Sequence, residues 1–154
     1  MSKQICIILI LTAFCSYRVF ATRDTITSTQ DLKTYFSDIV DFDTVYISNG
    51  EYKVRDVFIK KHGLTIIGIN NPVLDADNES GIITVEADNV TIKGITFRNT
   101  GISFVNDVCA IRVQNSKGVK IQNNTVENSF FAIYLSNTTN SYVDKNVIKG
   151  NSVT

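Results

Sequence analysis

The feature that most constrains the fold is a repeated pattern of short apolar triplets separated by polar turns. Residues 111–113 (IRV) align with residues 133–135 (IYL), and the same shift takes Ile121 to Val143. Each triplet alternates apolar and polar positions, which is typical of a strand with one buried face. Such triplets are shorter than usual sandwich strands, but three of them per repeat fit one coil of a solenoid.

A related shift extends the pattern upstream. It takes residues 57–59 to 83–85 and residues 64–66 to 90–92. These alignments define four coils, which begin near Val57, Ile83, Ile111 and Ile133. We therefore predict an all-β fold, a right-handed parallel β-helix (a pectate-lyase-like solenoid). Its coils are expected to stack at about 4.8 Å and to bury Ile, Val and Leu against equivalent residues of the neighbouring coils.

Asparagine recurs where the chain is expected to turn between strands. Asn124 aligns with Asn146, and Gly94 aligns with Asn123. Both residue types tolerate the left-handed backbone that sharp corners require. Stacked asparagine amides also hydrogen-bond to one another along the axis of such structures. The alignment therefore predicts an asparagine ladder with Asn124 over Asn146.

Residues 1–21 have the features of a secretory signal peptide. Lys3 supplies a positive charge, residues 5–14 are mainly apolar, and Val19 and Ala21 occupy the small-residue positions of a cleavage site. We predict cleavage after Ala21 and export of the mature chain. The alternative is an uncleaved N-terminal anchor.

The remaining chain divides into a cap and the coils. Residues 22–56 are predicted to form an N-terminal cap, with strands that follow a short amphipathic helix. The apolar residues at helical spacing are Leu32, Tyr35, Phe36, Ile39 and Val40. Residues 57–154 contain the coils, with an insertion at 100–109 that should form a protruding loop. Because no cap follows the last coil, we expect a fragment truncated at its C-terminus.

Formal net charge is zero, which provides no long-range attraction to nucleic acid, and we predict no nucleic-acid partner. The most suggestive charged set is Arg98, Glu127 and Lys149, which align on successive coils. A catalytic ladder and a solvated row of cross-coil ion pairs are both consistent with this spacing. We favour ion pairs, because the row contains only one carboxylate.

Other acidic residues are interpreted as parts of turns. Asp75 and Asp77 lie in the stretch LDADNESG, whose spacing does not match a known calcium loop. Turn formation explains them more simply than weak Ca²⁺ binding. Asp107 lies in the insertion and has no aligned carboxylate.

Candidate metal ligands are few. The mature chain has one histidine, His62, and one cysteine, Cys109, and the only methionine is Met1. The aligned frames place His62 and Cys109 in different parts of the coil, whereas zinc and copper sites usually need two or more N or S ligands. Cys109 is flanked by apolar residues and is expected to be a buried thiol without a disulfide. Metal ligands are left unassigned.

Several aromatic side chains are expected to face outward. Tyr134 and Tyr142 occupy the polar positions of their triplets, and Phe130 and Phe131 lie at a turn. Exposed aromatic rings favour a sugar-binding wall or a partner-docking surface. The alternative is that the phenylalanine pair packs the corner.

Four stretches together resemble the N-terminal half of NosD-family proteins: residues 43–52 (DTVYISNGEY), 64–76 (LTIIGINNPVLDA), 87–101 (ADNVTIKGITFRNTG) and 110–151. The resemblance implies a periplasmic β-helix protein of nitrous oxide reductase maturation. It implies nitrous oxide reductase, an ABC-type transporter (permease and ATPase) and a copper chaperone as partners, with membrane contact only through them. It also implies copper as the metal, although no cofactor site is evident in the residues themselves.

We therefore expect an exported scaffold that assists copper-centre assembly and is not an enzyme, and we assign no catalytic or cofactor-binding residue. One alternative is a polysaccharide-active β-helix enzyme (a lyase, hydrolase or epimerase). That alternative predicts carboxylates clustered with Arg or Lys on adjacent coils. A second alternative is a glycan-binding surface module.

Overall fold

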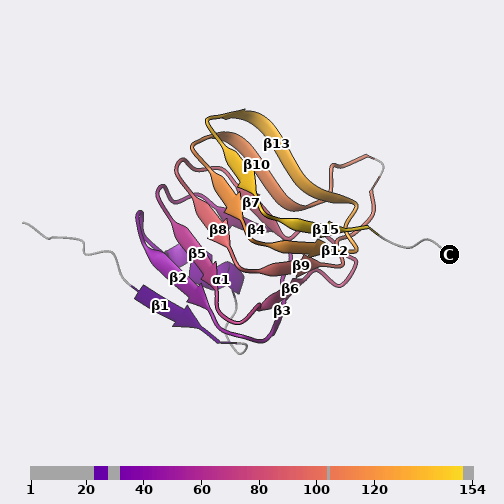
Figure 1. Cartoon of the computed structure of the whole chain (residues 1–154), viewed down its shortest axis with the longest axis horizontal. Helices are drawn as coiled ribbons and strands as arrows, with labels where there is room; N and C mark the ends of the chain where they lie inside the picture. The colour runs from indigo at the N-terminus through magenta and orange to yellow at the C-terminus, as the bar shows by residue number, and fades with distance from the viewer. Residues whose placement is uncertain (1–22, 28–31, 104, 151–154) are drawn as a thin grey trace, which may run out of the picture.

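The computed structural model describes residues 23–27, 32–103 and 105–150, so the predicted signal peptide lies outside the described residues. The chain winds through three parallel sheets, from the indigo β1 to the yellow β15 (Figure 1). Within these ranges no helix has both the length and the apolar character needed to span a membrane. The predicted right-handed parallel β-helix is confirmed.

The sheets run side by side along the axis of the solenoid. The six-stranded sheet contains β1 (Arg23–Ile26), β2 (Thr44–Ile47), β5 (Thr65–Gly68), β8 (Thr91–Lys93), β11 (Lys120–Gln122) and β14 (Tyr142–Asp144). The five-stranded sheet contains β3 (Glu51–Lys53), β6 (Val73–Asp75), β9 (Thr96–Arg98), β12 (Thr125–Glu127) and β15 (Val147–Lys149). The four-stranded sheet contains β4 (Val57–Ile59), β7 (Ile83–Val85), β10 (Cys109–Lys117) and β13 (Phe131–Thr139).

The predicted stacking register is confirmed. Val57 pairs with Ile83, Ile83 with Ile111, and Ile111 with Ile133. The first three of these side chains are at most 1% exposed. A β-branched apolar residue, Val or Ile, thus repeats at one place in each coil, because an apolar side chain fills the position between two like neighbours.

The helix α1 (Leu32–Asp38) lies beside β4, which is the edge strand of the four-stranded sheet. Leu32 and Phe36 are each 2% exposed and pack into the core. A helix in this position protects an otherwise open sheet edge. The predicted capping helix is therefore present, and within the same 22–56 region β2 and β3 already pair with β5 and β6.

One corner shows how the sequence sets the backbone. The residues that follow one another at this corner all have φ between 53° and 70°: Phe42, Gly63, Asn89, Gly118 and Asn140. Asn and Gly tolerate this left-handed region, whereas Phe rarely adopts it. A Cβ added to Gly63 would lie 2.2 Å from the Phe42 ring, so a larger residue would have to displace that exposed ring as well as adopt the left-handed backbone.

A second corner carries the predicted asparagine ladder. Asn124 is 1% exposed, and its amide nitrogen donates to the side-chain oxygen of Asn146 at 3.1 Å. The same nitrogen donates to the carbonyl of Ile92, and the side-chain oxygen accepts from the N–H of Ile95. This amide satisfies backbone groups that would otherwise be buried without partners.

The last coil differs from the inner ones. Leu135, Val143 and Ile148 occupy core positions but are 43%, 45% and 60% exposed. Between β9 and β10, residues 99–108 form the loop that stands out at the right in Figure 1. The predicted protruding insertion is therefore present among the described residues on either side of residue 104.

Candidate functional site

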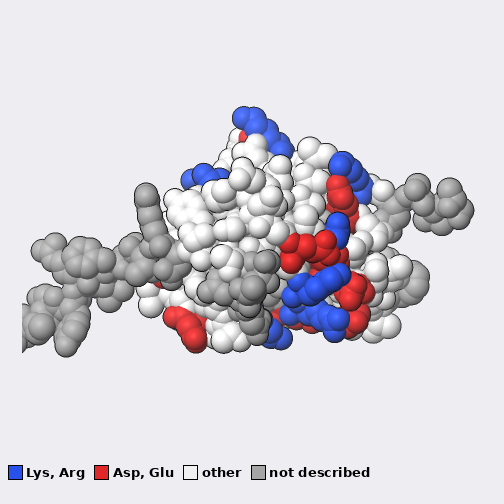
Figure 2. Space-filling view, turned by 90° about the horizontal axis from the view of Figure 1, so that it is seen from below, with Lys and Arg blue, Asp and Glu red and all other residues white. Residues whose placement is uncertain are grey.

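The outer face of the five-stranded sheet carries a row of charges that we call the charged band. It consists of one residue from each strand, with alternating sign: Lys53, Asp75, Arg98, Glu127 and Lys149. Figure 2 shows blue and red side chains gathered on this side of the molecule. Stacking places a charge of opposite sign above and below each inner member.

Asp75 is the buried member of the charged band and is 1% exposed. Its Oδ2 accepts from Arg98 Nε at 2.8 Å and lies 3.3 Å from Lys53 Nζ, and Asn99 donates to both oxygens at 3.1 Å. Its Oδ1 accepts from the N–H of Asp77 at 2.8 Å. Burial opposes ionisation of Asp75, but these hydrogen bonds and charges outweigh it and lower the pKa to about 2.

The charged band corrects two expectations from the sequence. Glu127 pairs with Lys149 at 2.7 Å as expected, but Arg98 turns instead to Asp75 and to Glu51, whose Oε2 lies 2.7 Å from the guanidinium. The interpretation that only one carboxylate is present was therefore wrong. Asp75 also ends β6 rather than lying within a turn, although its bond to the N–H of Asp77 does begin one.

His62 has a structural role at the corner that follows the four-stranded sheet. Its Nδ1 accepts from the N–H of Asp88 at 3.0 Å, and Asp88 in turn accepts from the N–H of Lys117 at 2.8 Å. On the preceding coil Asp41 accepts from the N–H of His62. The imidazole therefore accepts a backbone N–H from the next coil, as the Asp41 and Asp88 carboxylates do at the same corner.

Cys109 is 3% exposed, and its thiol donates to the carbonyl of Asp107 at 3.0 Å. Burial raises the pKa of the thiol, which agrees with an unreactive buried cysteine. In the described part of the chain, no three His, Cys, Asp or Glu side chains come together in a way that holds a metal ion. These residues do not fit a self-contained copper site.

The outer face of the four-stranded sheet is hollowed. One hollow of about 370 Å³ lies between the sheet and the 99–108 loop, with Phe58, Thr84 and Arg112 on the sheet side. Asn106 and Asp107 contribute the loop side. The Arg112 guanidinium donates to the Asp107 carbonyl and so ties the loop to the sheet.

A second hollow of about 370 Å³ lies between the same sheet and α1. Phe58 lines both hollows, and the two hollows together are here called the sheet groove. Lys60 and Phe36 also line the second hollow. Sequence reasoning missed Phe58 and Arg112, although both occupy the outward, central position of a recognised triplet.

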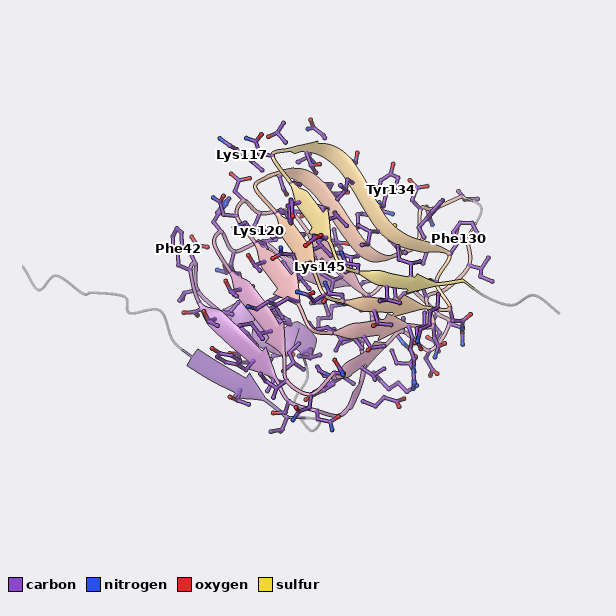
Figure 3. The ribbon with its side chains drawn as sticks, in the orientation of Figure 1. Phe42, Lys117, Lys120, Phe130, Tyr134 and Lys145 are labelled. Carbon is purple, nitrogen blue, oxygen red and sulfur yellow. The ribbon has the colours of Figure 1, made fainter. Side chains whose placement is uncertain are left out.

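Three aromatic residues lie near the last coil of the same sheet, outside the lining of the two hollows. The rings of Phe130 and Phe131 meet edge to face at 4.8 Å, and Phe131 lies 6.2 Å from Tyr134. Arg112 lies over the Tyr134 ring at 5.5 Å. Figure 3 shows Tyr134 on the outer side of β13 and Phe130 at the corner before it. Tyr142, also predicted to face outward, is 53% exposed but belongs to the six-stranded sheet.

Comparison with protein families gives a match to the model described as periplasmic copper-binding protein (NosD), over residues 36–154. No curated protein matches the chain.

Two solved structures are similar to the chain, both pectin methylesterases in complex with hexasaccharides. The first, a mutant, has a TM-score of 0.67 and 14% identity, over 86% of this chain and 50% of the enzyme. The second has a TM-score of 0.59 and 14% identity, over 77% of this chain and 46% of the enzyme. The chain thus spans about half the length of each enzyme, and at this identity the likeness shows the fold alone.

Proposed function

Since the chain belongs to the NosD family of periplasmic copper-binding proteins, we propose that it is an exported β-helix scaffold that assists copper-centre assembly of nitrous oxide reductase. The family match over residues 36–154 is the observation that carries this proposal. The proposed partners are nitrous oxide reductase, an ABC-type permease and ATPase, and a copper chaperone. The proposed location is the periplasm, with membrane contact only through the transporter.

The architecture supports a scaffold role. Each coil is hydrogen-bonded to its neighbours along three sheets, so groups on different coils are held at fixed separations. Copper delivery through the described residues is not supported, because His62 Nδ1 already accepts a backbone N–H and Cys109 is buried. We therefore assign docking to this part of the chain and copper ligation to its partners.

Deletion of the gene in a nitrous-oxide-reducing host tests the proposal. Nitrous oxide reductase purified from the deletion strain is expected to contain little copper, and the strain should consume nitrous oxide slowly. The full chain should restore both properties. A version that lacks residues 1–21 should restore neither, because without the predicted signal peptide it would not be exported to the periplasm. Fully loaded reductase in the deletion strain would refute the proposal.

A polysaccharide-active enzyme is the second candidate, because the charged band brings carboxylates and bases together on adjacent coils as that alternative predicted. The two similar structures are also pectin methylesterases bound to hexasaccharides. Against this, every oxygen of Asp75 is already hydrogen-bonded, which leaves it poorly placed as nucleophile or acid. Methanol release from methyl-esterified pectin, abolished by Asp75→Asn, would favour the enzyme, and no release would favour the scaffold.

A further inference from the structure

The 99–108 loop carries the two most exposed large apolar side chains of the described residues. Val105 is 93% exposed and Ile102 is 70% exposed, and we call this pair the apolar tip. The Oγ of Ser103 accepts from the N–H of Val105 at 3.3 Å and from the N–H of Asn106 at 2.9 Å. Apolar side chains gathered on a projecting segment typically mark an interaction surface.

The apolar tip stands on a base that is bonded to the coils on both sides. The N–H of Gly101 donates to the Ser80 carbonyl at 2.9 Å, and a Cβ on Gly101 would lie 2.8 Å from the Glu79 backbone. Thr100 is 2% exposed, and its Oγ accepts from the N–H of Phe130 at 2.9 Å. Because the base is held in this way, a partner that buries the tip has little loop entropy to overcome.

Carboxylates lie beside the apolar tip. Asp56, Glu79 and Asp107 line the hollow under the loop. Glu79 pairs with Arg55, but within the described residues no Lys or Arg forms an ion pair with Asp56 or Asp107. Arg112 also lines this hollow, and counting both guanidinium groups still leaves one net negative charge. The surface that fits the tip is therefore an apolar recess with a positive rim.

The hollow between α1 and the four-stranded sheet, here called the α1 hollow, is such a recess. It has a volume of about 370 Å³, and its lining includes two aromatic rings and three lysines: Phe36, Phe58, Lys33, Lys60 and Lys61. Lys60 is engaged with Glu86 at 3.5 Å and lies over the Phe58 ring. Lys61 forms no ion pair in the described part of the chain. The α1 hollow thus has an unpaired cation that complements the unpaired carboxylates beside the tip.

The apolar tip and the α1 hollow belong to the same side of the molecule, since Phe58 lines the α1 hollow as well as the hollow under the loop. The tip does not fill the α1 hollow of its own chain, because Val105 remains 93% exposed. Two copies that meet face to face around a two-fold axis can exchange these contacts. The contact is then made twice and the assembly closes as a dimer.

We propose that the chain forms a symmetric dimer in which the apolar tip of each copy enters the α1 hollow of the other. Asp107 lies next to Lys61 of the partner subunit in each of the two contacts. The tips are small, so the buried area is at the low end for specific interfaces, and we expect a Kd of about 10 μM. This association does not depend on the role in copper-centre assembly.

Sedimentation velocity of the chain purified after export tests the proposal, over a range of about 1 to 100 μM. The wild type should show a monomer–dimer equilibrium. Val105→Asp places a charge in both apolar contacts and should weaken the dimer at least about a hundredfold. Phe42→Asp makes the same kind of change at an exposed ring on another corner and should leave the equilibrium unchanged.

A charge exchange tests the predicted pairing directly. Asp107→Lys and Lys61→Glu should each weaken the dimer about tenfold, because each leaves two like charges face to face. The chain that carries both substitutions should regain the affinity of the wild type. A merely structural role of either residue would not produce this rescue.

Thermal unfolding at a concentration where the chain is monomeric separates lost association from lost folding. The three substituted side chains are at least partly exposed, so Tm should change by only a few degrees. Three results would overturn the proposal: a wild type that stays monomeric at about 100 μM, a dimer that survives Val105→Asp, or no rescue by the double substitution. A dimer that survives would use another surface, such as the open edge of β13.

Discussion

The outer faces of the five-stranded and four-stranded sheets are built by the same stacking but differ in how closely their side chains cover the sheet. On the five-stranded sheet, Asp75 and Arg98 satisfy one another and their neighbours. On the four-stranded sheet, the 99–108 loop and α1 rise on either side and leave Phe58 in an open groove. The difference is that ion pairs bury Asp75 on one face, whereas on the other face hollows remain beside side chains that are also paired, such as Arg112 with the Asp107 carbonyl.

The largest expected effect of a single substitution on this comparison comes from Asp75→Asn. The change keeps the size of the side chain but removes the negative charge beside Arg98 and Lys53, and we expect a loss of about 3 kcal/mol in the free energy of unfolding. Denaturant titration at pH 7 measures it. If the variant were as stable as the wild type, the charged band would not have the stabilising role assigned to it.

The pH dependence of the same pair gives a somewhat smaller effect. Because the pKa of Asp75 is lowered from 3.8 to about 2 on folding, its ionisation stabilises the folded state above pH 4 by about 2 kcal/mol. This contribution should disappear as the pH falls towards 2. The stability difference between the wild type and Asp75→Asn should therefore narrow over that range. A constant difference from pH 7 to pH 2 would contradict the assignment.

Arg112→Met tests how the groove wall is held. The substitution removes the bond to the Asp107 carbonyl and the contact with the Tyr134 ring, and should cost about 1 kcal/mol. Limited proteolysis should then cleave the 99–108 loop faster. Lys120→Met, which removes the same charge from the six-stranded sheet, is the matched control and should leave the cleavage rate unchanged. Equal rates in the two variants would mean that Arg112 does not anchor the loop.

The smallest effect is expected at the exposed end of the charged band. Glu127 and Lys149 are 34% and 61% exposed, so Glu127→Gln should cost about 0.5 kcal/mol or less. Added salt should reduce even this loss, because exposed charges are screened. A loss as large as that of Asp75→Asn would show that the stabilisation is spread along the band rather than concentrated at its buried member.

The stacking register was predictable because it rests on local alternation. An apolar residue at Ile83 requires another at Val57 and at Ile111, and the sequence shows all three. The link from Asp75 to Arg98 was harder to see. The offset between these residues is 23, whereas that between His62 and Asp88 on the neighbouring corner is 26, because turn lengths differ around one coil. One shift therefore could not align all three sheets.

The sheet groove was less predictable for a different reason. The outward positions of Phe58 and Tyr134 follow from their triplets, but a groove also needs walls. One wall depends on Arg112 reaching the carbonyl of Asp107 in the irregular loop, and the other on the contact of α1 with β4. Both are tertiary contacts between segments that do not belong to the same repeat, so the periodicity of the sequence could not predict them.

The stacking also determines how the molecule should open. Backbone bonds such as Thr91 N–H to the Leu64 carbonyl and Lys120 N–H to the Val90 carbonyl join each coil only to its neighbours. An inner coil therefore exchanges its amide protons with solvent only after a coil next to it has separated. Protection of the amides against exchange should consequently rise from β15, whose residues are exposed, towards β8 and β9. The exchange rate of a residue should therefore depend on its coil rather than on its sheet.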